Sequence, residues 1–241
     1  MTESEASESG SPIYHHKPKD REWTVPKNPA LHLEEIEAHL KEHLGEIETV
    51  YHEILSDLVH LDILFLPAHR QKPYHTLVTS GVSDSPMAVP AGMEDFSHAE
   101  LMINLPTEWP LDQESFKNEA NYWPVRWLKQ IGRLPHEYDT WVGWGHTIPN
   151  GDPAEQIANT EFAGVMLSPP YWLSPDFFQL QTDSGDKICF YNLVPLYQEE
   201  MNLKLAKGAE ALLEALFDKN GIGPIVDIGR RNVAKKKGWF R

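Results

Sequence analysis

The amino-acid sequence predicts an α+β (mixed α/β) fold, a single compact domain in which helices flank a central mixed or largely antiparallel sheet. Strand-like segments occur in runs instead of alternating strictly with helices, which is typical of α+β proteins. The chain has 241 residues, of which 41% are hydrophobic, enough to bury a sizeable core. After residue 30 the sequence shows no internal repeat and no linker, which favours one domain.

The first element is a helix that follows a polar leader. Residues 1–28 contain serine and proline and little apolar surface, so we expect a disordered or loosely attached leader. A helix is predicted over residues 29–44, because Asn28 can cap it, Pro29 suits a first turn and Gly45 ends the pattern. The apolar residues at helical spacing are Leu33, Ile36, Leu40 and Leu44.

Three strands are predicted next, over residues 57–68, 74–83 and 98–110. The first is apolar, alternates and ends at Pro67. The third ends at Pro106, because proline cannot donate a hydrogen bond to a sheet.

A second helix, two strands and a third helix complete the pattern. The second helix has Pro124 near its first turn, and its apolar side is formed by Trp127, Leu128, Ile131 and Leu134. Strands are predicted over residues 160–170 and 186–196, and the latter contains the single cysteine, Cys189, which we expect to be a buried structural thiol.

The last helix is predicted over residues 197–221, where Asn220 and Gly221 stop it. Its apolar stripe consists of Met201, Leu205, Leu212 and Leu216. Residues 221–231 add a short strand or an extended arm, and residues 233–241 form a basic tail.

The net charge of −15 is concentrated in one part of the chain. Residues 31–121 contain 17 acidic and 4 basic residues, a net charge of −13. Such a segment repels nucleic acid and attracts basic proteins. The basic tail is interpreted as a solubilising end, so we expect no direct binding of nucleic acid.

The sequence also indicates the cellular compartment in which the protein resides. It begins with MTESEASESGSP, which is not a secretory signal, and it contains no apolar run of the about 20 residues that cross a membrane. A single cysteine cannot form a disulfide within the chain, which is typical of proteins in a reducing compartment. We therefore expect a cytoplasmic protein that does not bind membranes.

One motif indicates an enzyme. Residues His39, Glu42 and His43 match the H-x-x-E-H pattern of inverted zinc peptidases, and Glu119 could supply a third ligand. The pattern specifies only three residues, so a match can arise by chance in a chain with twelve histidines. Because phosphate-binding, dinucleotide-binding and nucleophile-elbow motifs are missing from the sequence, we expect no catalysis and no cofactor, and a zinc hydrolase stays an open alternative.

Residues 138–151, YDTWVGWGHTIPNG, form the candidate binding segment. Its glycines and its Pro-Asn-Gly turn exclude a helix, while tryptophans often dominate binding surfaces. Packing of both tryptophans against the helix that contains Trp123 and Trp127 is the alternative. The predicted partner-binding residues are Asp139, Trp141, Trp144, Gly145 and His146.

Four segments together resemble the suppressor-of-fused domain family, in its bacterial branch. They are HTLVTSGVSDSPM (75–87), AELMINLPTEWP (99–110), residues 121–150 with GWGHTIPN, and GPIVDIGRR (223–231). The resemblance implies a mixed α/β domain over residues 29–232 that binds proteins. Animal members hold a short peptide of a transcription factor, and bacterial members look like immunity proteins that neutralise toxins. The animal proteins have an acidic residue where this chain has Gly145, and a second half for which this chain has no room.

The resulting hypothesis is a non-catalytic immunity protein (antitoxin). Its partner would be a basic toxin domain such as a nuclease, which would meet the acidic segment. A regulatory binding scaffold without a toxin partner is the alternative.

Overall fold

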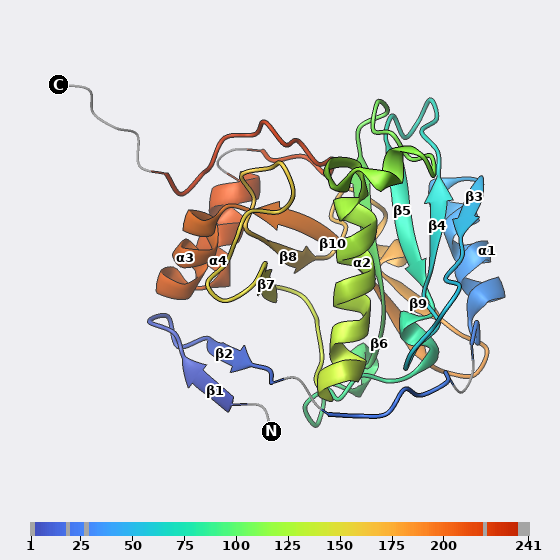
Figure 1. Cartoon of the computed structure of the whole chain (residues 1–241), viewed down its shortest axis with the longest axis horizontal. Helices are drawn as coiled ribbons and strands as arrows, with labels where there is room; N and C mark the ends of the chain where they lie inside the picture. The colour runs from blue at the N-terminus through green and yellow to red at the C-terminus, as the bar shows by residue number, and fades with distance from the viewer. Residues whose placement is uncertain (1–2, 18–19, 27–28, 219–220, 236–241) are drawn as a thin grey trace.

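An open sheet of eight strands forms the centre of the structure (Figure 1). The computed structural model describes residues 3–17, 20–26, 29–218 and 221–235. Seven strands follow the order β3-β4-β5-β6-β10-β8-β7, and β9 also pairs with β10. The strands are β3 (Thr49–Tyr51), β4 (Asp62–Leu66), β5 (His75–Ser80), β6 (His98–Leu105), β7 (Thr147–Pro149), β8 (Gly164–Ser168), β9 (Gln179–Gln181) and β10 (Lys187–Leu196).

The sheet is largely antiparallel. Among the strand pairs of the described residues, only β6 and β10 run parallel, with Ile188 opposite His98. The predicted fold class, α+β with a mixed or largely antiparallel sheet, is therefore confirmed.

Two helices, α1 (Leu33–Leu44) and α2 (Glu119–Tyr138), cover opposite faces of this sheet. Successive side chains of a strand point to opposite faces. On β4, Ile63 accordingly packs in the core under α2, and the next residue, Leu64, packs in the core under α1.

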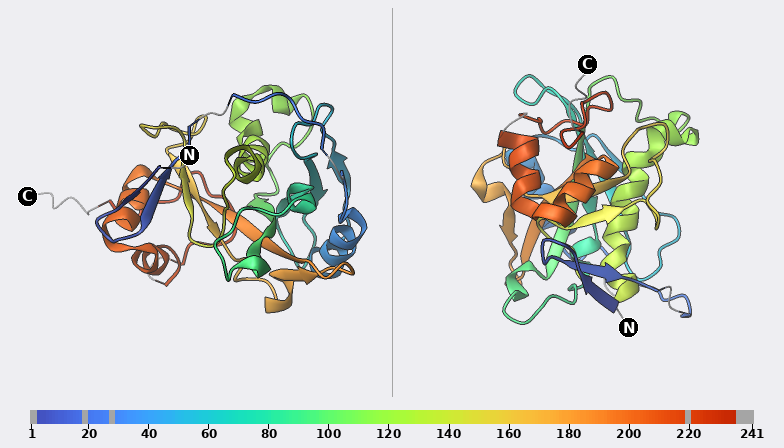
Figure 2. Two further views of the ribbon diagram at one scale, coloured as in Figure 1. Left: turned by 90° about the horizontal axis from the view of Figure 1, so that it is seen from below. Right: turned by 90° about the vertical axis from the view of Figure 1, so that its left-hand side faces the viewer.

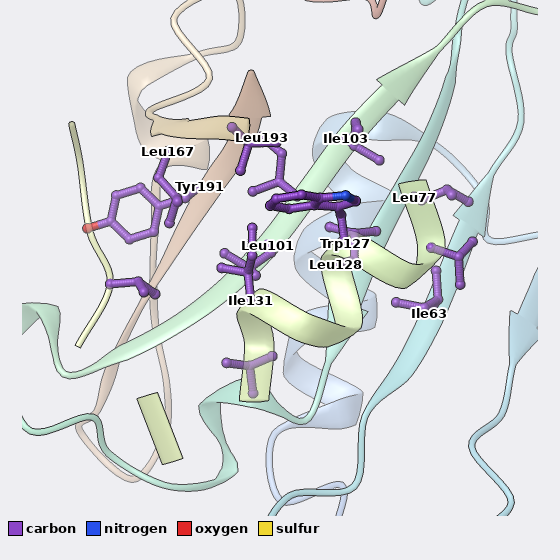
Figure 3. Packing of buried hydrophobic residues seen from close by; sticks show 14 of the residues in the cluster. Ile63, Leu77, Leu101, Ile103, Trp127, Leu128, Ile131, Leu167, Tyr191 and Leu193 are labelled. Atoms are coloured by element: carbon purple, nitrogen blue, oxygen red, sulfur yellow. The ribbon is translucent and has the colours of Figure 1, made fainter. Parts of the chain in front are cut away.

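The larger core lies between α2 and the central strands (Figure 3). Trp127, Leu128 and Ile131 project from α2 toward the sheet and are at most 3% exposed. Each such side chain contributes about 1.5–3 kcal/mol by leaving water. The sheet residues beneath them include Ile63, Leu77, Leu101 and Ile103.

The predicted strands are present, but the shortest ones are not evident in the sequence. β4, β5, β6, β8 and β10 lie within the predicted ranges, and β6 ends before Pro106 as expected. β3, β7 and β9 each have three residues, too few for an alternating pattern to be recognised.

Two helix boundaries differ from the prediction. α1 begins at Leu33 instead of residue 29, because the amides of Ala30 and Leu31 donate to the Asp84 carboxylate (2.8 and 2.9 Å) and Ala30 has a positive φ of 63°. Asn28 lies outside the described residues. α2 begins at Glu119, before Pro124, with the Asn118 side chain accepting from the Ala120 amide.

The prediction of one helix over residues 197–221 is wrong. Gly208, with φ 90° and ψ 170°, separates α3 (Gln198–Lys207) from α4 (Ala209–Leu213), which continues as a π-helical turn (Glu214–Asp218). Glycine adopts this conformation without the penalty that a Cβ brings.

The described part of the predicted leader contains regular structure. β1 (Glu3–Ala6) and β2 (Pro12–His15) form an antiparallel hairpin, which lies beside α3 (Figure 2). The Ser9 amide donates to the Leu205 carbonyl (2.9 Å) at the end of α3, where helix carbonyls lack partners within the helix. The boundary at residue 28 stays a prediction.

The segment after residue 221 is an extended arm, one of the two expected forms. Ile225 bridges Asn104 of β6 in parallel. Arg230 donates to the Glu200 carboxylate (Nη1–Oε1 2.7 Å), and Glu200 is fully buried. This ion pair fixes the arm to α3. Of the predicted basic tail, residues 236–241 lie outside the described residues.

A buried carboxylate organises the turn after β5. Glu100 of β6 is fully buried. Its Oε1 accepts from the amides of Gly81 and Ser83 (3.0 Å each) and from the Ser83 hydroxyl (2.6 Å), and its Oε2 accepts from the Thr79 hydroxyl. Burial raises the pKa of Glu100, and these donors oppose the shift.

We expect Glu100→Ala to lower the free energy of unfolding by about 3 kcal/mol, because it leaves several buried donors without an acceptor. Glu100→Gln keeps one acceptor oxygen and should lose less. Urea-induced unfolding measures both. Glu108→Ala, at an exposed position, is the control and should change stability by about 0.5 kcal/mol or less. Equal effects of Glu100→Ala and Glu108→Ala would contradict the prediction.

Candidate functional site

The candidate segment leaves the end of α2 and runs along β8. Asp139 caps α2 with a positive φ of 48°. Further along, the Gly145 amide donates to the Leu167 carbonyl (2.8 Å), and the Leu167 amide donates to the His146 carbonyl (2.9 Å). These bonds hold the loop against β8, so its exposed side chains are presented from a fixed backbone.

Two glycines are required in this loop. A Cβ on Gly143 would lie 2.8 Å from the Trp141 ring, closer than carbon atoms approach in proteins. Gly145 has a positive φ of 79°, which other residues adopt at a cost. The glycines thus let the chain pass around Trp141 and turn at Trp144.

The two tryptophans have different surroundings. Trp141 is partly buried, packs on the core under α2 and meets the His146 ring edge-on at 4.3 Å between centroids. Trp144 is 57% exposed. Core packing therefore accounts for Trp141, whereas Trp144 offers aromatic surface to solvent.

His146 is partly buried and lies near a lysine. Burial, together with the charge of Lys204, lowers the pKa of His146 to about 4. Lys204 of α3 donates to the Thr147 hydroxyl (3.2 Å). His146 is therefore neutral at physiological pH.

The structure adds two aromatic residues that the sequence did not single out. Tyr171 is 53% exposed and lies near the Trp144 side chain, and its ring contacts Phe217 at 5.9 Å between centroids. We call Trp144, Tyr171 and Phe217 the aromatic surface. It borders a groove of about 430 Å³ lined by Tyr171, Trp172, Leu213, Phe217, Asp218, Ile222 and Pro224.

No periodic signal links these residues. Tyr171 follows two prolines after β8, and Phe217 lies in the π-helical turn. The packing of the Tyr171 and Phe217 rings against each other in the folded chain identifies them, whereas the sequence pattern does not.

Of the predicted binding residues, Asp139 is set apart. Trp141, Gly145 and His146 adjoin Trp144, but Asp139 lines a separate groove of about 280 Å³ at the end of α2. That groove is also bordered by Thr24, Val25, Leu58, Ser85, Pro86, Ala88, Pro135 and His136.

The residues of the zinc alternative are not brought together. His39 is 8% exposed, donates from Nε2 to the Phe177 carbonyl (3.0 Å), and stacks on the Phe177 ring; because a carbonyl can only accept, Nε2 carries the proton. The neighbouring His43 ring lies 4.6 Å away.

Glu119 begins α2 on the opposite face of the sheet and pairs with Arg126 (2.6 Å), so it cannot join His39 and His43. Within the residues that the structure describes, no three histidine, cysteine, aspartate or glutamate side chains are placed to hold one metal ion. The ligand set of the zinc alternative, His39, His43 and Glu119, is therefore not assembled in the structure.

Comparisons with known proteins agree on one family. The sequence profile described as Suppressor of fused protein (SUFU) matches residues 57–231. A comparison with curated protein sequences gave no match. No helix among the described residues has the length and apolar character needed to span a membrane.

Three solved structures share the fold. A SUFU homologue from Neisseria gonorrhoeae is 17% identical, with a TM-score of 0.58 over 85% of this chain and 96% of that one. A structure of a Sufu–Fu complex is 14% identical, with a TM-score of 0.59 over 87% and 93%. Drosophila Suppressor of Fused is 14% identical, with a TM-score of 0.57 over 89% of this chain and 54% of that one.

The depressed pKa of His146 predicts a pH dependence of stability. The folded protein keeps His146 neutral down to about pH 4, whereas an unfolded chain protonates it near pH 6.5. Between pH 7.5 and pH 5 the unfolded state therefore binds more protons than the folded state does. The free energy of unfolding should fall by about 1–2 kcal/mol over this range because of His146.

NMR titration of the His146 ring tests this, and urea unfolding of His146→Gln should show a smaller loss at pH 5 than the wild type. His15→Gln removes a histidine whose side chain is 46% exposed and serves as the control. A midpoint for His146 near pH 6.5 would contradict the prediction.

Proposed function

The chain belongs to the suppressor of fused family, and on that premise we propose that it is a non-catalytic protein-binding domain. The aromatic surface carries the proposal. Trp144 and Tyr171 are each more than half exposed. Hydrogen bonds of Gly145 and His146 to Leu167 of β8 fix the backbone next to Trp144. Large aromatic side chains that are already ordered lose little entropy on binding, and they dominate the energy of many protein interfaces.

The family resemblance and the charge distribution support a more specific role. We propose that the protein is a cytoplasmic immunity protein that neutralises a toxin. The net charge of −13 over residues 31–121 favours a basic toxin domain such as a nuclease, because opposite charge speeds association. The fold of the Sufu–Fu complex structure supports protein binding in general. Neither role requires a cofactor.

A pull-down with the product of the adjacent gene, at low and at high salt, tests the toxin proposal. Binding that weakens with salt, and loss of growth when the immunity gene alone is deleted, are expected. Absence of binding and of any growth effect would contradict it. A housekeeping partner in place of a toxin would favour the regulatory scaffold.

We expect Trp144→Ala combined with Tyr171→Ala to weaken partner binding about 10-fold or more, since both lie in the aromatic surface. Stability should change little, because both side chains are exposed. Trp23→Ala, which removes a 60% exposed tryptophan outside this surface, is the matched control. Isothermal titration calorimetry measures the affinities, and an equal effect of the control would count against the aromatic surface.

A further inference from the structure

The groove beside the aromatic surface has an apolar wall and an acidic rim. Its lining includes the rings of Tyr171 and Phe217 and the exposed residue Asp218. Glu210 and Glu214 are exposed earlier in the same helical segment. Because residues four apart lie on one side of a helix, the three acids share the side that borders the groove. A fitting ligand therefore combines bulky apolar groups with positive charge.

The described part of the extended arm ends near this groove. The Val233 amide donates to the Glu200 carboxylate of α3 (2.9 Å), which anchors the arm. The Val233 side chain packs against the hydrophobic cluster that contains Leu216, and Phe217 of the groove packs against the same cluster. Lys235, which follows shortly after, is the last residue that the structure describes. The chain therefore continues from a point beside the α4 region.

The residues that follow have the composition that the groove requires. Residues 236–241 lie outside the described residues, and their sequence is KKGWFR. Two adjacent aromatic residues, Trp239 and Phe240, are flanked by two lysines and an arginine. Such a segment spans at most about 20 Å when it is extended, whereas a helix with its side chains is about 10–12 Å across. It is therefore long enough to reach the groove from the end of the described arm.

We propose that the KKGWFR segment (residues 236–241) occupies this groove. In this arrangement Trp239 and Phe240 cover Tyr171 and Phe217, while the lysine and arginine side chains face the acids of the α4 region. A segment attached this close to its binding site has an effective concentration in the millimolar range. A contact that is weak between separate molecules is therefore sufficient to cover the groove within one chain.

The consequence is a binding surface that the chain itself covers. A partner of the aromatic surface has to displace the KKGWFR segment, so its apparent affinity is lowered in proportion to the fraction of chains in which the groove is open. This regulation rests on the proposed protein-binding function, whereas the contact between the segment and the groove does not.

Calorimetry with the synthetic peptide AKKKGWFR, which repeats residues 234–241, tests the proposal. The wild-type chain should bind this peptide at least about 10-fold more weakly than the full chain with Trp239→Ala and Phe240→Ala, because its own segment covers the groove. Binding to this double variant should weaken about 10-fold when Tyr171→Ala is added. It should also weaken when Asp218→Lys is added, and at about 0.5 M NaCl.

Two variants serve as matched controls. Trp23→Ala removes a 60% exposed tryptophan elsewhere, so the peptide should bind this variant as weakly as it binds the wild type. Glu22→Lys reverses the charge of an exposed acid in the N-terminal part of the chain. Added to the double variant, it should leave the affinity for the peptide unchanged.

A second measurement uses the wild-type chain labelled with 5-fluorotryptophan. The ¹⁹F resonance of Trp239, assigned with Trp239→Phe, should shift when Tyr171→Ala is introduced, because the two rings are in contact in the proposed arrangement. The same resonance should not shift with Trp23→Ala. This measurement does not depend on the stability of the double variant.

Equal affinity of the peptide for the wild type and the double variant, or binding to neither, would overturn the inference. Binding that is insensitive to Tyr171→Ala and Asp218→Lys would also overturn it, because the basic segment would then contact another acidic region, such as residues 31–121. A wild-type dimer in light scattering that the double variant abolishes would assign the segment to a second copy of the chain. Each of these results leaves partner binding through Trp144 untouched, so the two proposals fail separately.

Discussion

The buried carboxylate of Glu100 determines how the helices are placed on the sheet. It lies in the central strand β6 and gathers the amides of the turn at residues 81–84. That turn then holds its neighbours: Asp84 accepts from the backbone before α1, and the Val82 carbonyl accepts from His136 near the end of α2. A buried carboxylate without hydrogen-bond donors would be costly, so the Glu100 side chain and the turn at residues 81–84 stabilise each other. The same turn contacts the start of α1 and the end of α2, and it thereby helps to position both helices.

The motifs that identify the family lie in this framework more than in the candidate loop at residues 138–151. The SGVSD segment is the turn around Glu100, and the glutamate of the AEL segment is Glu100 itself. In the GPIVDIGRR segment, Arg230 pairs with the buried Glu200 and lies over the Phe162 ring. These residues are needed for folding, which explains why a sequence resemblance indicates the fold more directly than it indicates a ligand.

Much of the fold could be predicted because the long strands are apolar runs buried on both faces and α2 buries one apolar face. The break at Gly208 and the three-residue strands could not, since they depend on tertiary contacts that periodicity does not record. The same holds for the site. The loop was identified from its composition, but only packing separates Trp144 from Trp141, and Tyr171 and Phe217 come from segments without any motif. Asp139 shows the reverse case, because it is close to Trp144 in sequence and yet lines a different groove.

The parallel pairing of β6 with β10 has a consequence for synthesis on the ribosome. His98 and its partner Ile188 are separated by 90 positions, whereas β4, β5 and β6 pair with strands that are near in the chain. The first half of the sheet can therefore assemble while the nascent chain still lacks β10. During that interval the β6 edge, whose residues from Ala99 to Leu105 become buried in the finished protein, has unpaired backbone groups open to association with other chains.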